Sequence, residues 1–266
     1  MPGPTQITPA QLMRQIGLPD GPHIIDVRIP DDVAAHPFVI PTAQRVAHDQ
    51  IATLPALPPG RRVVVVCQRG MKLSEGAAAL LRCNGMIAES LEGGTVAWAA
   101  AGLPMTPIAA LAGTGLWVTR QRPKIDRIAC PWLIRRFINP AARFLFVAAS
   151  EVAAVAERFD ATPFDIDNVT ISHRGDQCSF DALLDDFALH TPALDRLAQV
   201  IRGADTDRRD LAPQAAGLLA LSVGLSRMYR DDLAQLDAGL ALYDAMYRWA
   251  RDGHDEGHDW PAGRTL

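Results

Sequence analysis

Residues 62–76 constrain the fold more than any other part of the sequence. Four consecutive valines, Val63 to Val66, form an apolar run that is short and rich in β-branched side chains. Such a run suits a strand that is buried on both faces of a parallel sheet, and not a helix. Cys67 follows at the carboxyl end of this predicted strand. Gly70 then permits a tight turn, and Ser74 is expected to cap a helix over residues 75–82.

The loop that follows Cys67 is suited to hold an anionic sulfur. It places the cysteine before a helix N-terminus, and it carries two cations, Arg69 and Lys72. Both features favour the thiolate form of a cysteine, and a persulfide on Cys67 would be held in the same way. The alternative is a buried structural cysteine that closes a strand. The cationic glycine loop favours the reactive interpretation.

Strand patterns alternate with helical ones around this stretch. Strands are expected at residues 23–27, 62–66 and 87–91, helices at residues 8–16, 50–54 and 95–100, and a turn at residues 57–60. This alternation predicts an α/β fold with a parallel sheet covered by helices on both faces. Ligands bind at the carboxyl ends of the strands in such sheets, and Cys67 lies at one of these ends.

Three blocks of this half resemble a single-domain rhodanese, in the order of that family. They are residues 24–28 (Ile-Ile-Asp-Val-Arg), residues 63–72 (Val-Val-Val-Val-Cys-Gln-Arg-Gly-Met-Lys) and residues 91–98 (Leu-Glu-Gly-Gly-Thr-Val-Ala-Trp). The resemblance implies a rhodanese-like parallel sheet and a sulfurtransferase whose persulfide-forming nucleophile is Cys67. It implies no cofactor for sulfur transfer, a donor such as thiosulfate or a persulfide, and a thiol acceptor. Lys72 stands where these enzymes usually carry arginine. The implied substrate-binding residues are Gln68, Arg69, Gly70, Met71 and Lys72, with the pair Asp26 and Arg28 beside them, which can also be a plain ion pair.

A domain boundary is expected where the composition changes. Residues 102–115 carry several glycines and prolines and no charged side chain. We therefore expect a first domain at residues 1–108, a linker at 109–115, a mostly helical α+β domain at 116–251 and a polar tail at 252–266. The second domain is predicted to contain strands at residues 143–147 and 169–172 and helices at residues 151–159 (capped by Ser150), 180–189, 192–202, 213–230 and 231–251.

The second domain opens with a basic segment. Residues 115–145 carry seven Lys and Arg against one acidic residue, and residues 146–266 carry 11 against 21. Basic side chains within acidic surroundings favour a small oxyanion or internal ion pairs over duplex nucleic acid. Pro131 suits the first turn of a helix, which would put Cys130 near a helix N-terminus and favour its thiolate; a buried apolar cysteine is the alternative. The candidate oxyanion site is Arg120, Arg122, Lys124, Arg127 and Cys130.

A second group of residues suggests a divalent transition metal. His173 and Cys178 lie five positions apart on a predicted loop, with Asp176 between them. Imidazole, thiolate and carboxylate are the usual protein ligands of such ions, and Asp205 is a candidate to complete the set. The alternative is that His173 and Cys178 fix a turn by hydrogen bonding and packing.

This half is similar to the C-terminal domain of the chromate-resistance protein ChrB. The blocks that carry the similarity are residues 117–134, residues 173–180 (His-Arg-Gly-Asp-Gln-Cys-Ser-Phe) and residues 203–206 (Gly-Ala-Asp-Thr). The similarity implies a role in chromate resistance, by binding chromate or by sensing it.

Together these patterns predict a sulfurtransferase coupled to a domain that binds an oxyanion or a metal. The alternative is a chromate- or metal-responsive sensor without turnover; a chromate reductase is a third hypothesis, but no Gly-x-Gly-x-x-Gly fingerprint is present. Four widely spaced cysteines, and no apolar run long enough for a membrane span, favour a cytoplasmic protein. The pattern leaves the oligomeric state open.

Overall fold

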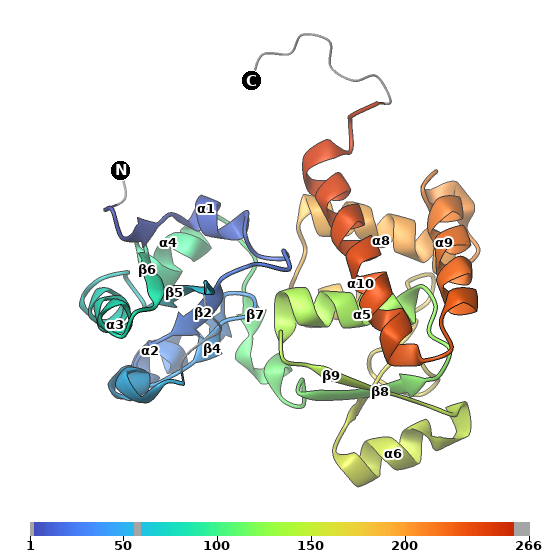
Figure 1. The fold of residues 1–266 in the computed structure, drawn as a ribbon, viewed down its shortest axis with the longest axis horizontal. Helices are drawn as coiled ribbons and strands as arrows, with labels where there is room; N and C mark the ends of the chain where they lie inside the picture. Colours follow the sequence, from blue (N-terminus) through green and yellow to red (C-terminus); the bar gives the residue numbers. More distant parts are fainter. Residues whose placement is uncertain (1–2, 56–59, 258–266) are drawn as a thin grey trace.

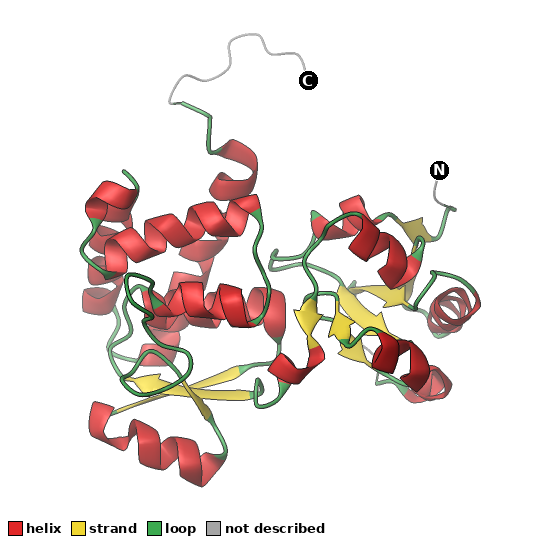
Figure 2. Ribbon diagram, turned by 180° about the vertical axis from the view of Figure 1, so that it is seen from behind, coloured by secondary structure: helices red, strands yellow, loops and turns green. Residues whose placement is uncertain are grey.

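The computed structural model describes residues 3–55 and 60–257. Its N-terminal half contains a five-stranded sheet in the order β1 (Gln6–Ile7), β6 (Ile87–Leu91), β5 (Arg62–Val66), β2 (His23–Asp26) and β4 (Gln44–Arg45), and all of its strand pairs are parallel. The helices around it are α1 (Pro9–Met13), α2 (Pro30–Ala35), the 3₁₀ helix η1 (His48–Thr53), α3 (Lys72–Cys83) and α4 (Gly94–Ala100). Helices cover both faces of the sheet (Figures 1 and 2). The predicted α/β class is confirmed.

The valine run is buried because its side chains alternate between two cores. All four valines are at most 1% exposed. Val63 and Val65 pack with Ala77, Ala78 and Leu81 of α3, whereas Val64 and Val66 belong to the core on the other face. This is the period-two geometry of a strand, and it places Cys67 at the carboxyl edge of the central strand.

The expected role of Ser74 is wrong. Helix α3 begins at Lys72, with Met71 as its N-cap, so that Ser74 is already the third helical residue. Its hydroxyl lies 3.1 Å from the Cys67 sulfur and donates to the Met71 carbonyl. The serine therefore contacts the cysteine instead of capping the helix. The predicted turn at residues 57–60 lies largely outside the described residues.

The second half contains a three-stranded parallel sheet and a stack of helices. The strands are β8 (Leu116–Arg120), β9 (Arg143–Val147) and β10 (Thr162–Pro163), in the order β10-β8-β9. The helices are α5 (Asp126–Leu133), which continues as the π-helical turn η3 (Ile134–Ile138), α6 (Val152–Phe159), α7 (Ser179–Asp186), α8 (Pro192–Asp205), α9 (Ala215–Met228) and α10 (Asp232–Arg248), followed by the π-helical turn η6 (Trp249–Gly253). Figure 1 shows α8, α9 and α10 stacked on one side of α5, with the sheet and α6 on the other.

Three local predictions for this half are wrong. Helix α5 starts at Asp126, so Pro131 lies inside it and Cys130 is a fully buried mid-helix residue. Pro131 has no backbone N–H to donate within the helix. Helix α5 tolerates this loss because the side chains from Ile128 to Leu133 are all buried. Ser150 lies inside a 3₁₀ turn (Ala149–Glu151) and does not cap α6. Residues 169–172 form a loop with one isolated bridge, between Phe164 and Ile171.

The two halves share one continuous apolar core. Gly17 has a positive φ of 85°, and a β-carbon at this position would lie 2.8 Å from the Tyr247 ring and closer still to Phe137. The Thr42 amide donates to the Phe137 carbonyl, and Arg251 donates to the Arg14 carbonyl. The N-terminal half is therefore docked on the end of α10 and on η3.

The connection between the halves is itself folded. Strand β7 (Thr106–Pro107) pairs antiparallel with β3 (Phe38–Val39) and leads into the 3₁₀ helix η2 (Ile108–Leu111).

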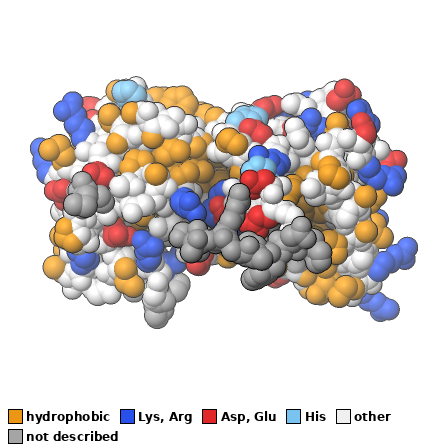
Figure 3. Space-filling view, turned by 90° about the horizontal axis from the view of Figure 1, so that it is seen from above, with side chains coloured by type: hydrophobic (Ala, Val, Ile, Leu, Met, Phe, Trp, Pro, Cys, Tyr) orange, Lys and Arg blue, Asp and Glu red, His pale blue; other side chains and the backbone are white. Residues whose placement is uncertain are grey.

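Acidic and basic side chains are interspersed over both halves on the face in Figure 3. Among the described residues, no helix combines the length and apolar character that a membrane span requires.

Candidate functional sites

The first candidate site is the loop between β5 and α3. Cys67 is 5% exposed, and its sulfur is 3.1 Å from the Ser74 hydroxyl. Gly70, with a φ of 65°, turns the chain back toward the helix. Arg69 and Lys72 are exposed at the rim, as is Met71, whose side chain is 62% exposed. The sulfur is thus nearly covered, and the loop that carries it exposes two cationic side chains.

The start of α4 holds this loop from the other side. The amides of Thr95 and Val96 donate to the carbonyls of Cys67 and Gln68, at 3.0 and 3.1 Å. The Thr95 hydroxyl also donates to the Gln68 side-chain oxygen. Gly94 has a φ of 61°, and a β-carbon there would lie 2.5 Å from the Gly70 nitrogen and closer to the Cys67 carbonyl oxygen. The Gly93-Gly94 pair therefore lets two backbone segments meet behind the cysteine.

The predicted pair Asp26 and Arg28 lies at the end of β2. Both side chains are buried, and the guanidinium makes three hydrogen bonds to the carboxylate, the shortest of 2.7 Å. Its remaining N–H groups donate to the carbonyls of His36 and Phe38. The pair thus fixes the segment that lines one side of a pocket of about 180 Å³, whose other side includes Gln68 and Thr95.

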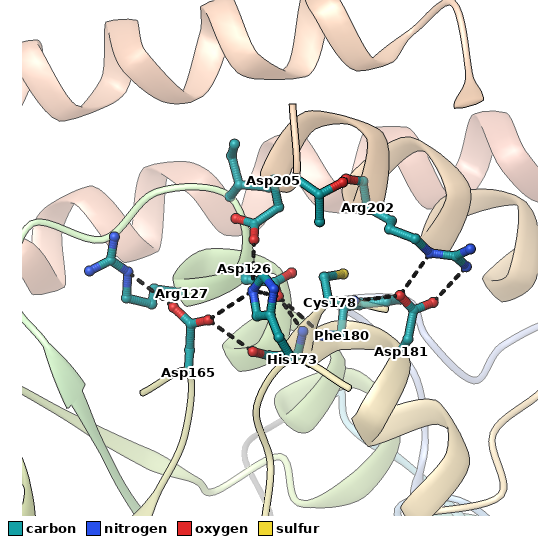
Figure 4. Close-up of polar contacts among 12 residues, drawn as sticks. Asp126, Arg127, Asp165, His173, Cys178, Phe180, Asp181, Arg202 and Asp205 are labelled. Atoms are coloured by element: carbon teal, nitrogen blue, oxygen red, sulfur yellow. Dashed lines mark hydrogen bonds and ion pairs between the residues drawn. The ribbon is translucent and has the colours of Figure 1, made fainter. Parts of the chain in front are cut away.

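The second candidate site is a group of carboxylates around one imidazole. His173 Nε2 lies 3.0 Å from Asp205 Oδ2, 3.7 Å from Asp165 Oδ1 and 3.9 Å from Asp126 Oδ2. Figure 4 shows the three carboxylates around the imidazole ring. Asp126 begins α5, and Asp205 ends α8. Asp165 lies just after β10, and His173 lies in the loop before α7. Potential ligand atoms of Asp126, His173 and Asp205 all lie within 4.8 Å of one another, so these three residues can hold a metal ion.

Asp126 is the most deeply buried member. It is 0% exposed, and its Oδ2 accepts hydrogen bonds from the backbone N–H groups of Ser179 and Phe180, at 2.6 and 3.3 Å. Burial, together with the charges of Asp205 and Asp165, raises the pKa of Asp126 well above its ordinary value. Burial, followed by the charge of Asp165, likewise raises the pKa of Asp205. These shifts identify a site in which negative charge is concentrated and poorly solvated.

Asp165 connects this group to two of the predicted oxyanion-binding arginines. Its Oδ2 lies 3.4 Å from Arg127 and 3.7 Å from Arg120, and its Oδ1 accepts a hydrogen bond from the Ser179 hydroxyl. Arg122 instead points to the α9–α10 turn, where it donates to the Tyr229 carbonyl. Lys124 is exposed.

The structure therefore does not bring the five predicted oxyanion-site residues together. Cys130 is buried inside α5, and burial, with the charges of Asp126 and Asp165, raises the pKa of its thiol well above the ordinary value. Of the two alternatives for Cys130, its full burial favours the buried apolar cysteine.

The predicted metal ligands are only partly assembled. His173 and Asp205 meet, but Asp176 is exposed on the loop, and the Cys178 side chain accepts from the backbone N–H of Asp181 at the start of α7. Burial and the charge of Asp126 raise the pKa of Cys178 strongly, which disfavours a thiolate ligand. The pattern of residues 173–178 missed both Asp126 and Asp165.

Comparisons with known proteins follow the same division of the chain. Residues 8–101 match the family model described as a rhodanese-like domain, and residues 117–250 match the one described as ChrB, C-terminal domain. Protein ChrB of Cupriavidus metallidurans is 39% identical over 132 residues, which are 49% of this chain and 39% of that relative. The chain thus matches less than half of the length of this relative.

Solved structures similar to the N-terminal half include two from other bacteria. A thiosulfate sulfurtransferase from Pseudomonas aeruginosa is 31% identical, with 40% of this chain and 20% of that chain covered and a TM-score of 0.35. A rhodanese-like domain protein from Staphylococcus aureus is 28% identical, with 35% and 90% covered and a TM-score of 0.32.

Proposed function

Since the chain belongs to the ChrB C-terminal domain family and also carries a rhodanese-like domain, we propose that it is a sulfurtransferase acting in chromate resistance. Cys67 carries the transferred sulfur as a persulfide. The observation that carries the proposal is the placement of the Cys67 sulfur at the end of the central strand, 3.1 Å from the Ser74 hydroxyl and inside a loop rimmed by Arg69 and Lys72.

The chemistry follows from this placement. The Cys67 thiolate attacks the outer sulfur of thiosulfate, the sulfur–sulfur bond of the donor breaks, and sulfite leaves with the bonding electron pair. An acceptor thiolate, or cyanide in the assay, then attacks the terminal sulfur of the persulfide and releases the Cys67 thiolate. Arg69 and Lys72 attract the dianionic donor, and the Ser74 hydroxyl turns its proton from the Met71 carbonyl to donate a hydrogen bond to the sulfur anion.

The test is thiocyanate formation from thiosulfate and cyanide. The Cys67→Ser variant is expected to lose this activity, because a serine hydroxyl forms no persulfide. Cys83→Ser is the matched control, since Cys83 is an exposed free cysteine at the other end of α3. Wild-type turnover in Cys67→Ser would refute the proposed role of Cys67.

For the second domain we propose the binding of an oxyanion or a divalent transition metal. Of the residues expected to bind an oxyanion, Arg120 and Arg127 remain together, both beside Oδ2 of Asp165. Chromate is a tetrahedral dianion, for which paired guanidinium groups are suitable ligands. Calorimetric titration of chromate into the Arg127→Gln variant and the wild type tests this role, and equal affinities would contradict it.

A sensor without turnover is the second candidate function. The buried carboxylate group around His173 favours it, because a ligand that neutralises this group would also stabilise the surrounding helices. The thiocyanate assay separates the two functions. A protein that binds its ligand and forms no thiocyanate with any sulfane donor would be a sensor.

A further inference from the structure

The carboxylates around His173 lack positive charge where they are buried. Arg120 and Arg127 both approach Oδ2 of Asp165, whereas the imidazole approaches Oδ1. His173 is the basic partner of Asp205, at 3.0 Å, and the same imidazole is the only basic side chain within 4 Å of Asp126 among the described residues. A single imidazole is therefore the only basic side chain within 4 Å of two carboxylates, one of them fully buried.

One oxygen of this group has no partner at all. The Asp126 Oδ2 atom is fixed by two backbone amides at the start of α7, whereas Oδ1 is buried and accepts no hydrogen bond from any described residue. Buried carboxylate oxygens without partners are costly and rare in folded proteins. A cation bound beside this carboxylate would lower the cost of burying it and would also supply the missing positive charge.

The spacing of the group fits one ion. Two ligands that each lie about 2.1 Å from a metal are about 3.0 Å apart in neighbouring octahedral positions and about 4.2 Å apart in opposite ones. His173 Nε2 lies 3.0 Å from Asp205 Oδ2 and 3.9 Å from Asp126 Oδ2. Both values fall within this range.

We propose that Asp126, His173 and Asp205 bind one divalent first-row metal ion of the manganese(II) or iron(II) class. Two carboxylates and one imidazole favour such ions over those that select thiolates. Cys178 and Cys130 are not ligands, and Asp165 supports the site from beside it. The inference rests on the proposed binding role of the second domain and is independent of the sulfur chemistry at Cys67.

The site is open on the side of His173. The imidazole is 43% exposed, and it lines a pocket of about 520 Å³ together with Asp176, Arg202, Thr206 and Arg208. Three protein ligands leave coordination positions free, and the site borders this pocket through His173. Water or a small anion can therefore reach the metal, which is the arrangement of reactive or sensing metal sites and not of closed structural ones.

The test is a titration of the full chain with Mn²⁺, followed by electron paramagnetic resonance and by the relaxation rate of water protons. The wild type is expected to bind one Mn²⁺ per chain, with an enhanced relaxation rate because exchangeable waters remain on the metal. Asp126→Asn, His173→Gln and Asp205→Asn are each expected to weaken binding more than about tenfold, since even the loss of supporting hydrogen bonds costs this much.

Asp176→Asn and Cys178→Ser are the controls, because Asp176 is exposed on the same loop, and serine in place of Cys178 removes the thiol but keeps a hydrogen-bonding group beside Asp126. Both should bind Mn²⁺ as the wild type does. The Cys67→Ser variant should also bind it, so a failed sulfurtransferase assay leaves this result unaffected. Thermal unfolding without metal identifies any variant that is not folded, and Asp205→Asn, at a partly exposed position, then replaces Asp126→Asn.

Two results would overturn the proposal. The first is the absence of saturable Mn²⁺ binding to the wild type. The second is binding that survives in Asp205→Asn and His173→Gln but is lost in Cys178→Ser. If Mn²⁺ binds but the relaxation rate of water protons is not enhanced, the claim that coordination positions remain open to water is refuted.

Discussion

Replacing Gly94 by alanine tests whether the contact between α4 and the Cys67 loop positions the sulfur. The residue has a φ of 61°, and the added β-carbon would lie 2.5 Å from the Gly70 nitrogen and 2.8 Å from the Gln68 carbonyl carbon. These are backbone atoms, so no flexible side chain can move aside to make room. Either the loop or the start of α4 has to shift.

The magnitude can be separated into two contributions with a control. Gly102 has a similar φ of 66°, but a β-carbon there would meet nothing within 4 Å. Gly102→Ala therefore measures the conformational cost alone, about 1–2 kcal/mol. Gly94→Ala adds the cost of overpacking, about 1–3 kcal/mol, so its total is about 2–5 kcal/mol.

Urea denaturation of the two variants gives these free energies of unfolding, and the thiocyanate assay is run on protein that is still folded. We expect Gly94→Ala to lower kcat about tenfold or more, because small displacements of a reacting group are costly to catalysis. Gly102→Ala should keep wild-type kcat. If Gly94→Ala is no more destabilised than Gly102→Ala and turns over normally, the packing of α4 does not position Cys67.

Three further predictions follow from the described contacts. Arg28→Met leaves a buried carboxylate unpaired and should lower the free energy of unfolding in urea by about 3–5 kcal/mol. Lys72→Arg should raise kcat/KM for thiosulfate about two- to tenfold in the thiocyanate assay, because a guanidinium binds an oxyanion through two N–H groups. Partial burial lowers the pKa of His190, but its hydrogen bonds to Asp195 and Asp185 outweigh this and raise it overall. The stabilisation by protonated His190 is therefore complete below the pKa of the unfolded state, about 6.5, and is lost as the pH rises through the pKa of the folded state. The Tm difference between the wild type and His190→Asn should therefore be larger at acidic than at alkaline pH.

The parts of the fold that the sequence predicts well are those with a simple local cause. The strand at Val63 to Val66 follows from an unbroken β-branched run, and each valine is buried as the pattern requires. Ser74 shows the limit of such reasoning. A serine near a helix start usually caps it, but here the hydroxyl contacts a sulfur seven residues earlier, and that contact depends on the path of the loop.

The second site was only partly predictable, because its ligands come from four separate segments. Residue type alone identifies His173 and Asp205 as candidate ligands. Asp126 escapes this reasoning, because Pro131 suggests that the helix starts later and leaves Asp126 in a basic loop. A useful signal was present. Asp126 lies two residues before the apolar run from Ile128 to Leu133, and a carboxylate next to such a run indicates a binding role. Asp165 carried no comparable signal, because its neighbours become buried only through tertiary packing.

The contact of Gly17 with Phe137 and Tyr247 bears on how sulfur would be delivered. Proteins that carry a reactive group between distant sites often hold it on a domain that swings on a flexible tether. Here the carrier domain is packed against its neighbour, and the connecting segment is tied down by β7. A persulfide on Cys67 would thus stay in one place, and the acceptor has to come to it by diffusion.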